Sequence, residues 1–118
     1  MGDAFTRLAD AVEAGNRHGL NRTMAEIGQP SDAWPWDWMS RMDAAFNGSL
    51  DAAKALHEAV LTGWIAKPQI GGAGAGVTVW HCTIEDWDSG QEISADNMPD
   101  PARAWLLAII RALAHVQK

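Results

Sequence analysis

The sequence predicts an α+β fold, in which a three-stranded antiparallel sheet is packed with helices and preceded by an N-terminal helical segment. Three stretches lead to this prediction. Residues 77–85 alternate in side-chain direction as a strand does, with apolar groups on both faces. Residues 101–116 carry apolar side chains at the spacing of a helix, and residues 49–61 resemble a helix that precedes the strands. The predicted order over residues 49–118 is therefore α-β-β-β-α.

Length and composition indicate one soluble domain. The 118 residues are expected to divide into a helical, tryptophan-rich segment, 1–48, and the α-β-β-β-α core, 49–118. Fifteen acidic and nine basic residues leave a net charge of -6, so we do not expect a long nucleic acid as partner. The single Cys82 excludes an internal disulfide. Without a signal peptide or a long apolar run, the protein is expected to be cytoplasmic, with no membrane partner.

Two short helices are expected at the N-terminus. The first can be capped by Asp3 and ended by Gly15. Its apolar residues recur at helical spacing: Phe5, Leu8, Ala9 and Val12. The second is predicted over residues 21–27, and Gly28 and Pro30 stop it.

The stretch Trp34-Pro35-Trp36-Asp37-Trp38 is the most unusual part of the chain. Pro35 favours an extended conformation at Trp34, so a continuous helix is not expected here. Asp37 can cap a short helix that follows. Two interpretations stay open: the tryptophans cover the core like a lid, or one or two of them line a pocket and stack on a planar ligand. Seven tryptophans and no tyrosine keep the second interpretation in play.

Ser49 is expected to cap the helix that opens the core, and Gly63 to end it. Residues 64–67 predict the first strand, with Pro68 marking an edge strand or an exit from the sheet. The strand over residues 77–85 is expected to be central and at least partly covered on each face.

After a turn over residues 86–90, residues 91–94 predict the third strand. The closing helix is expected to be capped by Asp100, to have Pro101 at its first position and to run to Val116.

Familiar catalytic and metal signatures are incomplete in this chain. The glycine run 71–76 precedes a strand rather than a helix, which favours a flexible connection between strands over a phosphate-binding loop. His57-Glu58 lacks the second histidine of a zinc-protease motif, and residues 86–97 lack the closing glutamate of a calcium loop. His81 and Cys82 point to opposite faces of a strand, and Cys82 is expected to be a small core residue. We therefore expect no enzyme activity, no metal and no cofactor.

Three segments resemble the phage ABA-sandwich domain family, a group of small phage and prophage accessory proteins. They are residues 46–53 (FNGSLDAA), residues 61–64 (LTGW) and residues 102–113 (ARAWLLAIIRAL). The resemblance implies a sheet sandwiched with helices and carries over no catalytic residue. The glycine run and the Trp34–Trp38 cluster depart from the family pattern, so they are where a particular function is expected to reside.

From these observations we expect a non-enzymatic phage or prophage accessory protein that counteracts bacterial immunity by binding and sequestering a nucleotide-derived immune signal. Tryptophans would stack on bases, and arginines would pair with phosphate. The negative net charge counts against this hypothesis. The candidate ligand-binding residues are Trp34, Trp36, Trp38, Arg41, Trp80, His81, Trp87 and Arg103.

Two hypotheses of other classes stay open. One is a protein-binding inhibitor of a host defence complex, similar to an anti-CRISPR protein, that acts through an aromatic surface. The other is a structural phage component that acts by self-association, and the chain is compatible with a homo-oligomer. An exposed apolar patch would favour the protein-binding hypothesis, and a concave pocket with convergent polar groups would favour the small-molecule one.

Overall fold

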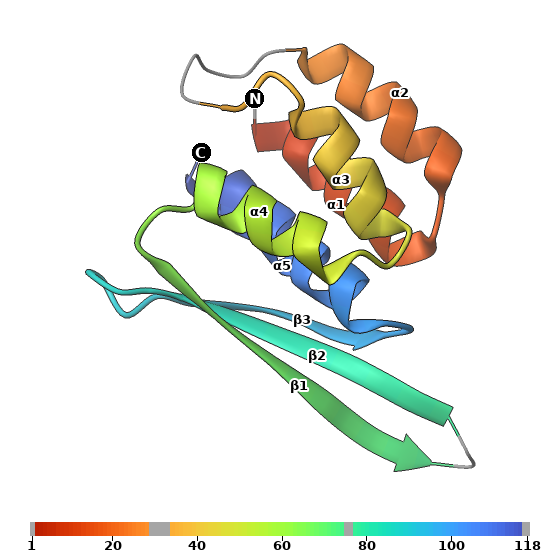
Figure 1. The fold of residues 1–118 in the computed structure, drawn as a ribbon, viewed down its shortest axis with the longest axis vertical. Coiled ribbons are helices and arrows are strands. Elements are labelled where there is room, and N and C mark those ends of the chain that lie inside the picture. The colour runs from red at the N-terminus through yellow and green to blue at the C-terminus, as the bar shows by residue number, and fades with distance from the viewer. Residues whose placement is uncertain (1, 29–33, 75–76, 117–118) are drawn as a thin grey trace.

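One sheet and five helices make up the described part of the chain, residues 2–28, 34–74 and 77–116 of a computed structural model. All of these helices lie on one face of the three-stranded sheet (Figure 1). The fold is α+β, as predicted. In chain order the elements are α1 (Gly2–Ala14), α2 (Arg17–Ile27), α3 (Trp38–Phe46), α4 (Leu50–Val60), β1 (Trp64–Gly74), β2 (Val77–Asp86), β3 (Glu92–Met98) and α5 (Pro101–Val116).

The sheet is antiparallel with the strand order β1-β2-β3, so β2 is the central strand, as predicted. Cys82 and Ile84 are fully buried against the helices. No helix in the described ranges lies over the opposite face (Figure 1), which corrects the expectation of at least partial cover on both faces. This face carries polar cross-strand pairs, which are compatible with exposure to water. The paired atoms are Lys67 Nζ and Glu85 Oε2 at 2.9 Å, His81 Nδ1 and Asp96 Oδ1 at 3.1 Å, and Thr83 Oγ1 and Ser94 Oγ at 3.0 Å.

Both outer strands are longer than predicted. β1 continues past Pro68 to Gly74, because the backbone stays paired with β2 beyond a bulge between Ile70 and Ala73. The predicted loop over residues 71–76 is therefore wrong for residues 71–74, and residues 75–76 lie outside the described part of the chain. Pro68 lies in an edge strand, as one of its two predicted roles required.

The two expected N-terminal helices are confirmed, with shifted starts, and they pack against each other. α1 already includes Asp3, so this residue lies in the first turn instead of capping it, while Gly15 ends the helix at a φ of 71°. α2 begins at Arg17, four residues earlier than predicted, because the Oδ1 of Asn16 accepts a hydrogen bond from the backbone N–H of Gly19 at 3.0 Å.

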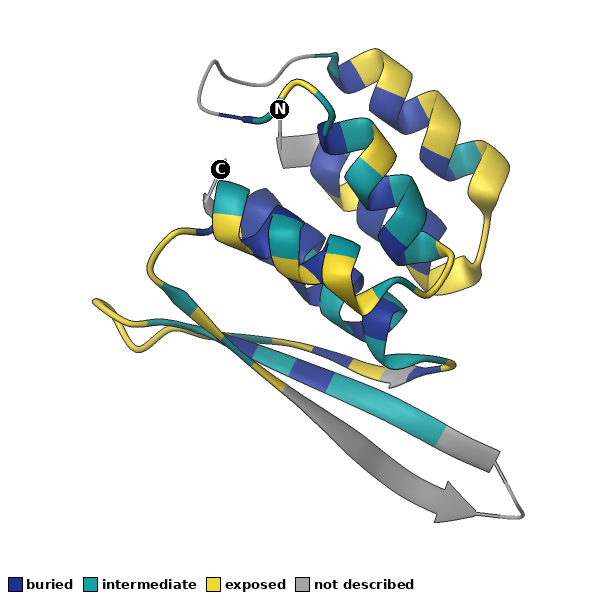
Figure 2. Cartoon of the chain, in the orientation of Figure 1, coloured by how far each residue is buried: buried dark blue, intermediate teal, exposed yellow. Residues whose placement is uncertain are grey.

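Helix α5 is the centre of the molecule. It begins and ends where the sequence predicts, and Asp100 Oδ1 accepts a hydrogen bond from the N–H of Arg103 at 2.8 Å. Residues 106–110 are buried on every side, since α5 lies between the sheet and helices α1, α3 and α4 (Figure 2). Ser49 caps α4 as predicted, accepting a hydrogen bond from Ala52 N–H at 3.1 Å.

Candidate functional site

Trp34 and Trp38 belong to the hydrophobic core. Only 9% of Trp34 and 1% of Trp38 is exposed. Their rings meet edge to face with centroids 5.1 Å apart, and Trp34 also contacts the ring of Phe5 at 5.8 Å. These two side chains confirm the interpretation that tryptophans cover the core. They leave little ring surface on which a planar ligand could stack.

Trp36 lies between these two buried residues in the sequence but is 91% exposed. A turn closes beneath it, with the N–H of Trp38 donating to the carbonyl of Pro35 at 3.2 Å. Asp37 occupies the N-cap position of α3, as predicted, but its side chain makes no capping hydrogen bond. It instead forms an ion pair with Arg41, with Oδ1 and Nε 3.1 Å apart, so the charge of Arg41 already has a partner.

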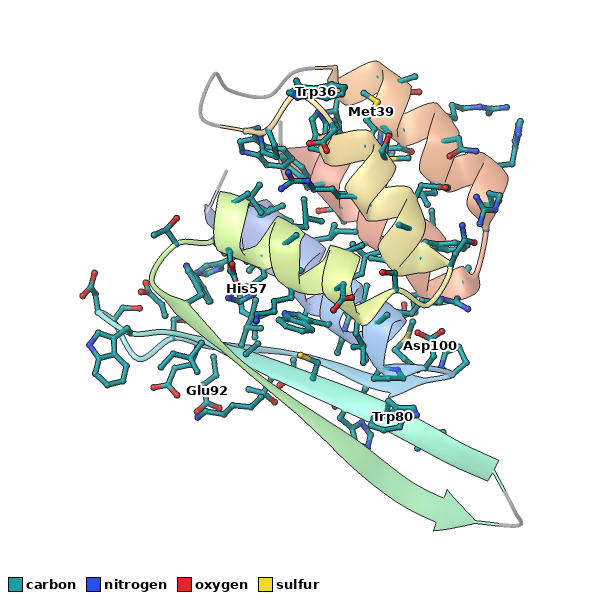
Figure 3. The ribbon with its side chains drawn as sticks, viewed as in Figure 1. Trp36, Met39, His57, Trp80, Glu92 and Asp100 are labelled. Carbon is teal, nitrogen blue, oxygen red and sulfur yellow. The ribbon has the colours of Figure 1, made fainter. Side chains whose placement is uncertain are left out.

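An open groove of about 350 Å³ lies between α2 and α3. It exists because α2 packs mainly on α1 and α3 mainly on α4 and α5, which leaves a furrow where α2 and α3 face each other. Trp36 and Met39 both lie at the start of α3 (Figure 3); Met39 lines the groove, and Trp36 precedes it by three residues without lining the groove itself. The groove is lined by Asn21, Met24, Ala25, Met39, Ser40 and Asp43.

The groove combines methionine side chains with a neutralised carboxylate. Met39 is partly exposed and supplies flexible apolar surface, which adapts well to a protein partner, whereas Met24 is only 4% exposed and belongs to the core. Asp43 is held by Arg17, with Oδ1 and Nη1 2.5 Å apart. None of the eight residues predicted to bind a ligand lines this groove. Sequence reasoning missed it because the two helices that form it carry no binding motif.

Trp80 and His81 point to opposite faces of the sheet. Trp80 packs against the core below the helices, whereas His81 faces outward and contacts Asp96. Figure 3 shows Trp80 on β2, away from the start of α3 where Trp36 lies.

Arg103, on α5, contacts α1 and α3. Its Nη2 donates to the carbonyl of Val12 at 2.9 Å, near the C-terminal end of α1, where positive charge is favourable. Its guanidinium carbon lies 4.9 Å from the ring centroid of Phe46, and that of Arg17 lies 5.3 Å from the same centroid. These contacts explain the position of Arg103 without a ligand.

Trp87 follows β2 in the turn before β3 and is 72% exposed. This turn and the start of α3 lie on opposite sides of the layer formed by α4 and α5 (Figure 1). The structure thus groups Trp34, Trp36, Trp38 and Arg41 around the start of α3. It places the other four predicted residues in three separate regions.

Two chemically versatile side chains are buried. Burial raises the pKa of the Cys82 thiol from 9.0 to about 12, which keeps it protonated, and its burial confirms the predicted core role. His57 is also buried, and both of its ring nitrogens form hydrogen bonds within the protein.

Within the described ranges, no group of three His, Cys, Asp or Glu side chains is arranged to hold a metal. No helix in the described part of the chain has the length and apolar character needed to cross a membrane.

Comparison of the chain with protein-family models, with curated proteins and with solved structures found no match.

Proposed function

We propose that the protein acts by binding another protein through Trp36 and the adjoining groove between α2 and α3. The observation that supports this function best is the exposure of Trp36, at 91%, three residues before Met39, which lines the groove. Tryptophan is enriched among the side chains that dominate protein–protein binding energy. Burial of the exposed indole would be favourable, and a partner protein can provide the surface that buries it.

The groove fits a peptide side chain better than a nucleotide. It is open, its wall includes the partly exposed Met39, and its charged residue is an acid already paired with Arg17. A phosphate would need an unpaired cation, and Arg41 next to Trp36 is paired with Asp37. In the phage setting implied by the resemblance, the partner would be a component of a host defence complex. Sequestration of a nucleotide-derived signal stays a prediction, and it is tested together with protein binding.

A photo-crosslinking amino acid at position 36 tests this function in cells that carry candidate defence systems. The matched control places the same amino acid at position 50, because Leu50 is an exposed apolar residue at the start of α4, outside the groove. We expect one crosslinked protein from position 36 and none from position 50. Using that purified partner, calorimetry should show about tenfold or more weaker binding for Trp36→Ala and unchanged binding for Leu50→Ala.

Two results would contradict protein binding. One is equal crosslinking from positions 36 and 50, which would indicate chance collisions. The other is saturable binding of a cyclic nucleotide or an ADP-ribose derivative that Trp36→Ala abolishes, which would support nucleotide sequestration instead.

A further inference from the structure

A second exposed apolar site lies at one end of the sheet. Trp87 is 72% exposed and Ile65 is 38% exposed. The N–H of Trp87 donates to the carbonyl of Gly63 at 3.1 Å. Gly63 comes directly before β1, and Ile65 is the second residue of that strand. Both exposed side chains therefore belong to the same end of the sheet. Neither is needed to fill the core.

The turn that carries Trp87 is held by its own hydrogen bonds. Asp86 Oδ1 accepts from the N–H of Asp88 at 3.2 Å, and Asp86 Oδ2 accepts from Ser89 Oγ at 3.0 Å. The backbone of Asp86 also accepts from Gly90 N–H at 2.8 Å and donates to the carbonyl of Gln91 at 2.9 Å. Gly90 adopts a φ of 73°, which suits glycine. Because the turn is already ordered, a partner that covers Trp87 pays little conformational entropy for this segment.

Acidic side chains lie in the same turn as Trp87 and at the start of β3. Asp88 and Glu92 are exposed and make no ion pair with the described residues. The nearest base on β1 is Lys67, whose pKa is raised by its hydrogen bond to Glu85, then by the charge of Glu85 and, less, of Glu92. The local field is therefore negative. Such a field repels phosphates and anionic membranes and attracts basic surfaces.

We infer that the turn between β2 and β3 is a docking surface for a basic protein segment, with Trp87 and Ile65 as apolar anchors and Asp88 and Glu92 as the acidic rim. The matching surface offers apolar side chains that cover the indole, together with Lys or Arg that pair with the carboxylates. This turn lies on the other side of the α4–α5 layer from the start of α3 (Figure 1), so one partner can occupy each site at the same time.

Two synthetic peptides test the inference by calorimetry on the full chain. The first is an amphipathic helix built from Lys and Leu, and the second is its counterpart built from Glu and Leu. We expect the lysine peptide alone to bind, with an affinity that falls as salt rises. Trp87→Ala should weaken its binding about tenfold or more, while Leu50→Ala, a control at an exposed apolar residue of α4, should leave it unchanged. The double variant Asp88→Asn with Glu92→Gln should reduce the salt dependence.

Four results would overturn the inference. They are equal binding of the lysine peptide by Trp87→Ala, equal binding of both peptides, binding of phosphatidylcholine vesicles that depends on Trp87, and self-association in sedimentation that Trp87→Ala removes. The last result would assign this surface to a second copy of the chain. Circular dichroism of each variant shows whether it is folded. A failure here leaves the Trp36 site untouched, because its crosslinking test uses a different position.

Discussion

Trp105 donates its indole N–H to Nδ1 of His57 across 3.1 Å, which joins helix α5 to helix α4 in the interior of the protein. The other ring nitrogen of His57, Nε2, lies 2.7 Å from the carbonyl oxygen of Trp64 at the start of β1. Since the indole can only donate, Nδ1 must accept, and Nε2 must carry the hydrogen and donate to the carbonyl. One buried imidazole therefore links α4, α5 and β1 in a single tautomer.

Breaking this link should destabilise the fold. Trp105→Phe removes the donor and leaves Nδ1 of His57 buried without a partner, which we expect to cost about 1–3 kcal/mol in the free energy of unfolding. His57→Phe leaves both the indole N–H and the Trp64 carbonyl unpaired, with a cost at least as large. Because each single variant already breaks the bond, the double variant should cost less than the sum, by about 0.5–3 kcal/mol. Urea denaturation of the four proteins measures this coupling, and strict additivity would contradict it.

Alkaline pH should weaken the fold through Cys82. Burial raises the pKa of this thiol from 9.0 to about 12, so above pH 9 the unfolded chain loses a proton that the folded chain keeps. Ionisation then stabilises only the unfolded state, and the free energy of unfolding falls as pH rises from 9 towards 12. Between about pH 8 and pH 10 the expected loss is about 1.4 kcal/mol.

Cys82→Ala is the matched control for this pH effect. The variant should be less stable than the natural chain at pH 8, because it removes a buried sulfur atom, yet it should lose less stability on going to pH 10. Lys67, whose pKa is also raised, is present in both proteins and cancels in the comparison. Urea denaturation at the two pH values provides the measurement. Equal losses in both proteins would exclude the thiol as the cause.

The order and type of the elements could be predicted because their signals are local. Asp100 and Pro101 mark the start of α5, and Ser49 marks the start of α4, so these boundaries match the structure. The extent of β1 could not be predicted, since residues 71–74 are held in the strand by pairing with a distant segment. Which tryptophans are exposed could not be predicted either. The burial of Trp34, for example, involves contact with Phe5 from α1, and the sequence around Trp34 does not show this contact.

The cap of α5 should contribute measurably because this helix contacts the sheet and three other helices. Asp100→Ala removes the acceptor for Arg103 N–H and should cost about 1 kcal/mol in the free energy of unfolding. Asp100→Asn keeps a side-chain oxygen at the same position and should cost clearly less, because asparagine caps helices about as well as aspartate. Thermal unfolding of both variants distinguishes the two, and equal losses would show that charge, rather than the cap, is responsible.

The neighbouring tryptophans should separate stability from binding. Trp38 is 1% exposed and contacts Trp34 edge to face, so Trp38→Ala leaves a large cavity and should cost about 3–5 kcal/mol. Trp36 is 91% exposed, so Trp36→Ala should change the free energy of unfolding by about 0.5 kcal/mol or less, while weakening partner binding. Urea denaturation compares the two, with acrylamide quenching of fluorescence as a check on exposure. A large loss of stability in Trp36→Ala would mean that this indole belongs to the core, and the groove between α2 and α3 would then lose its proposed anchor.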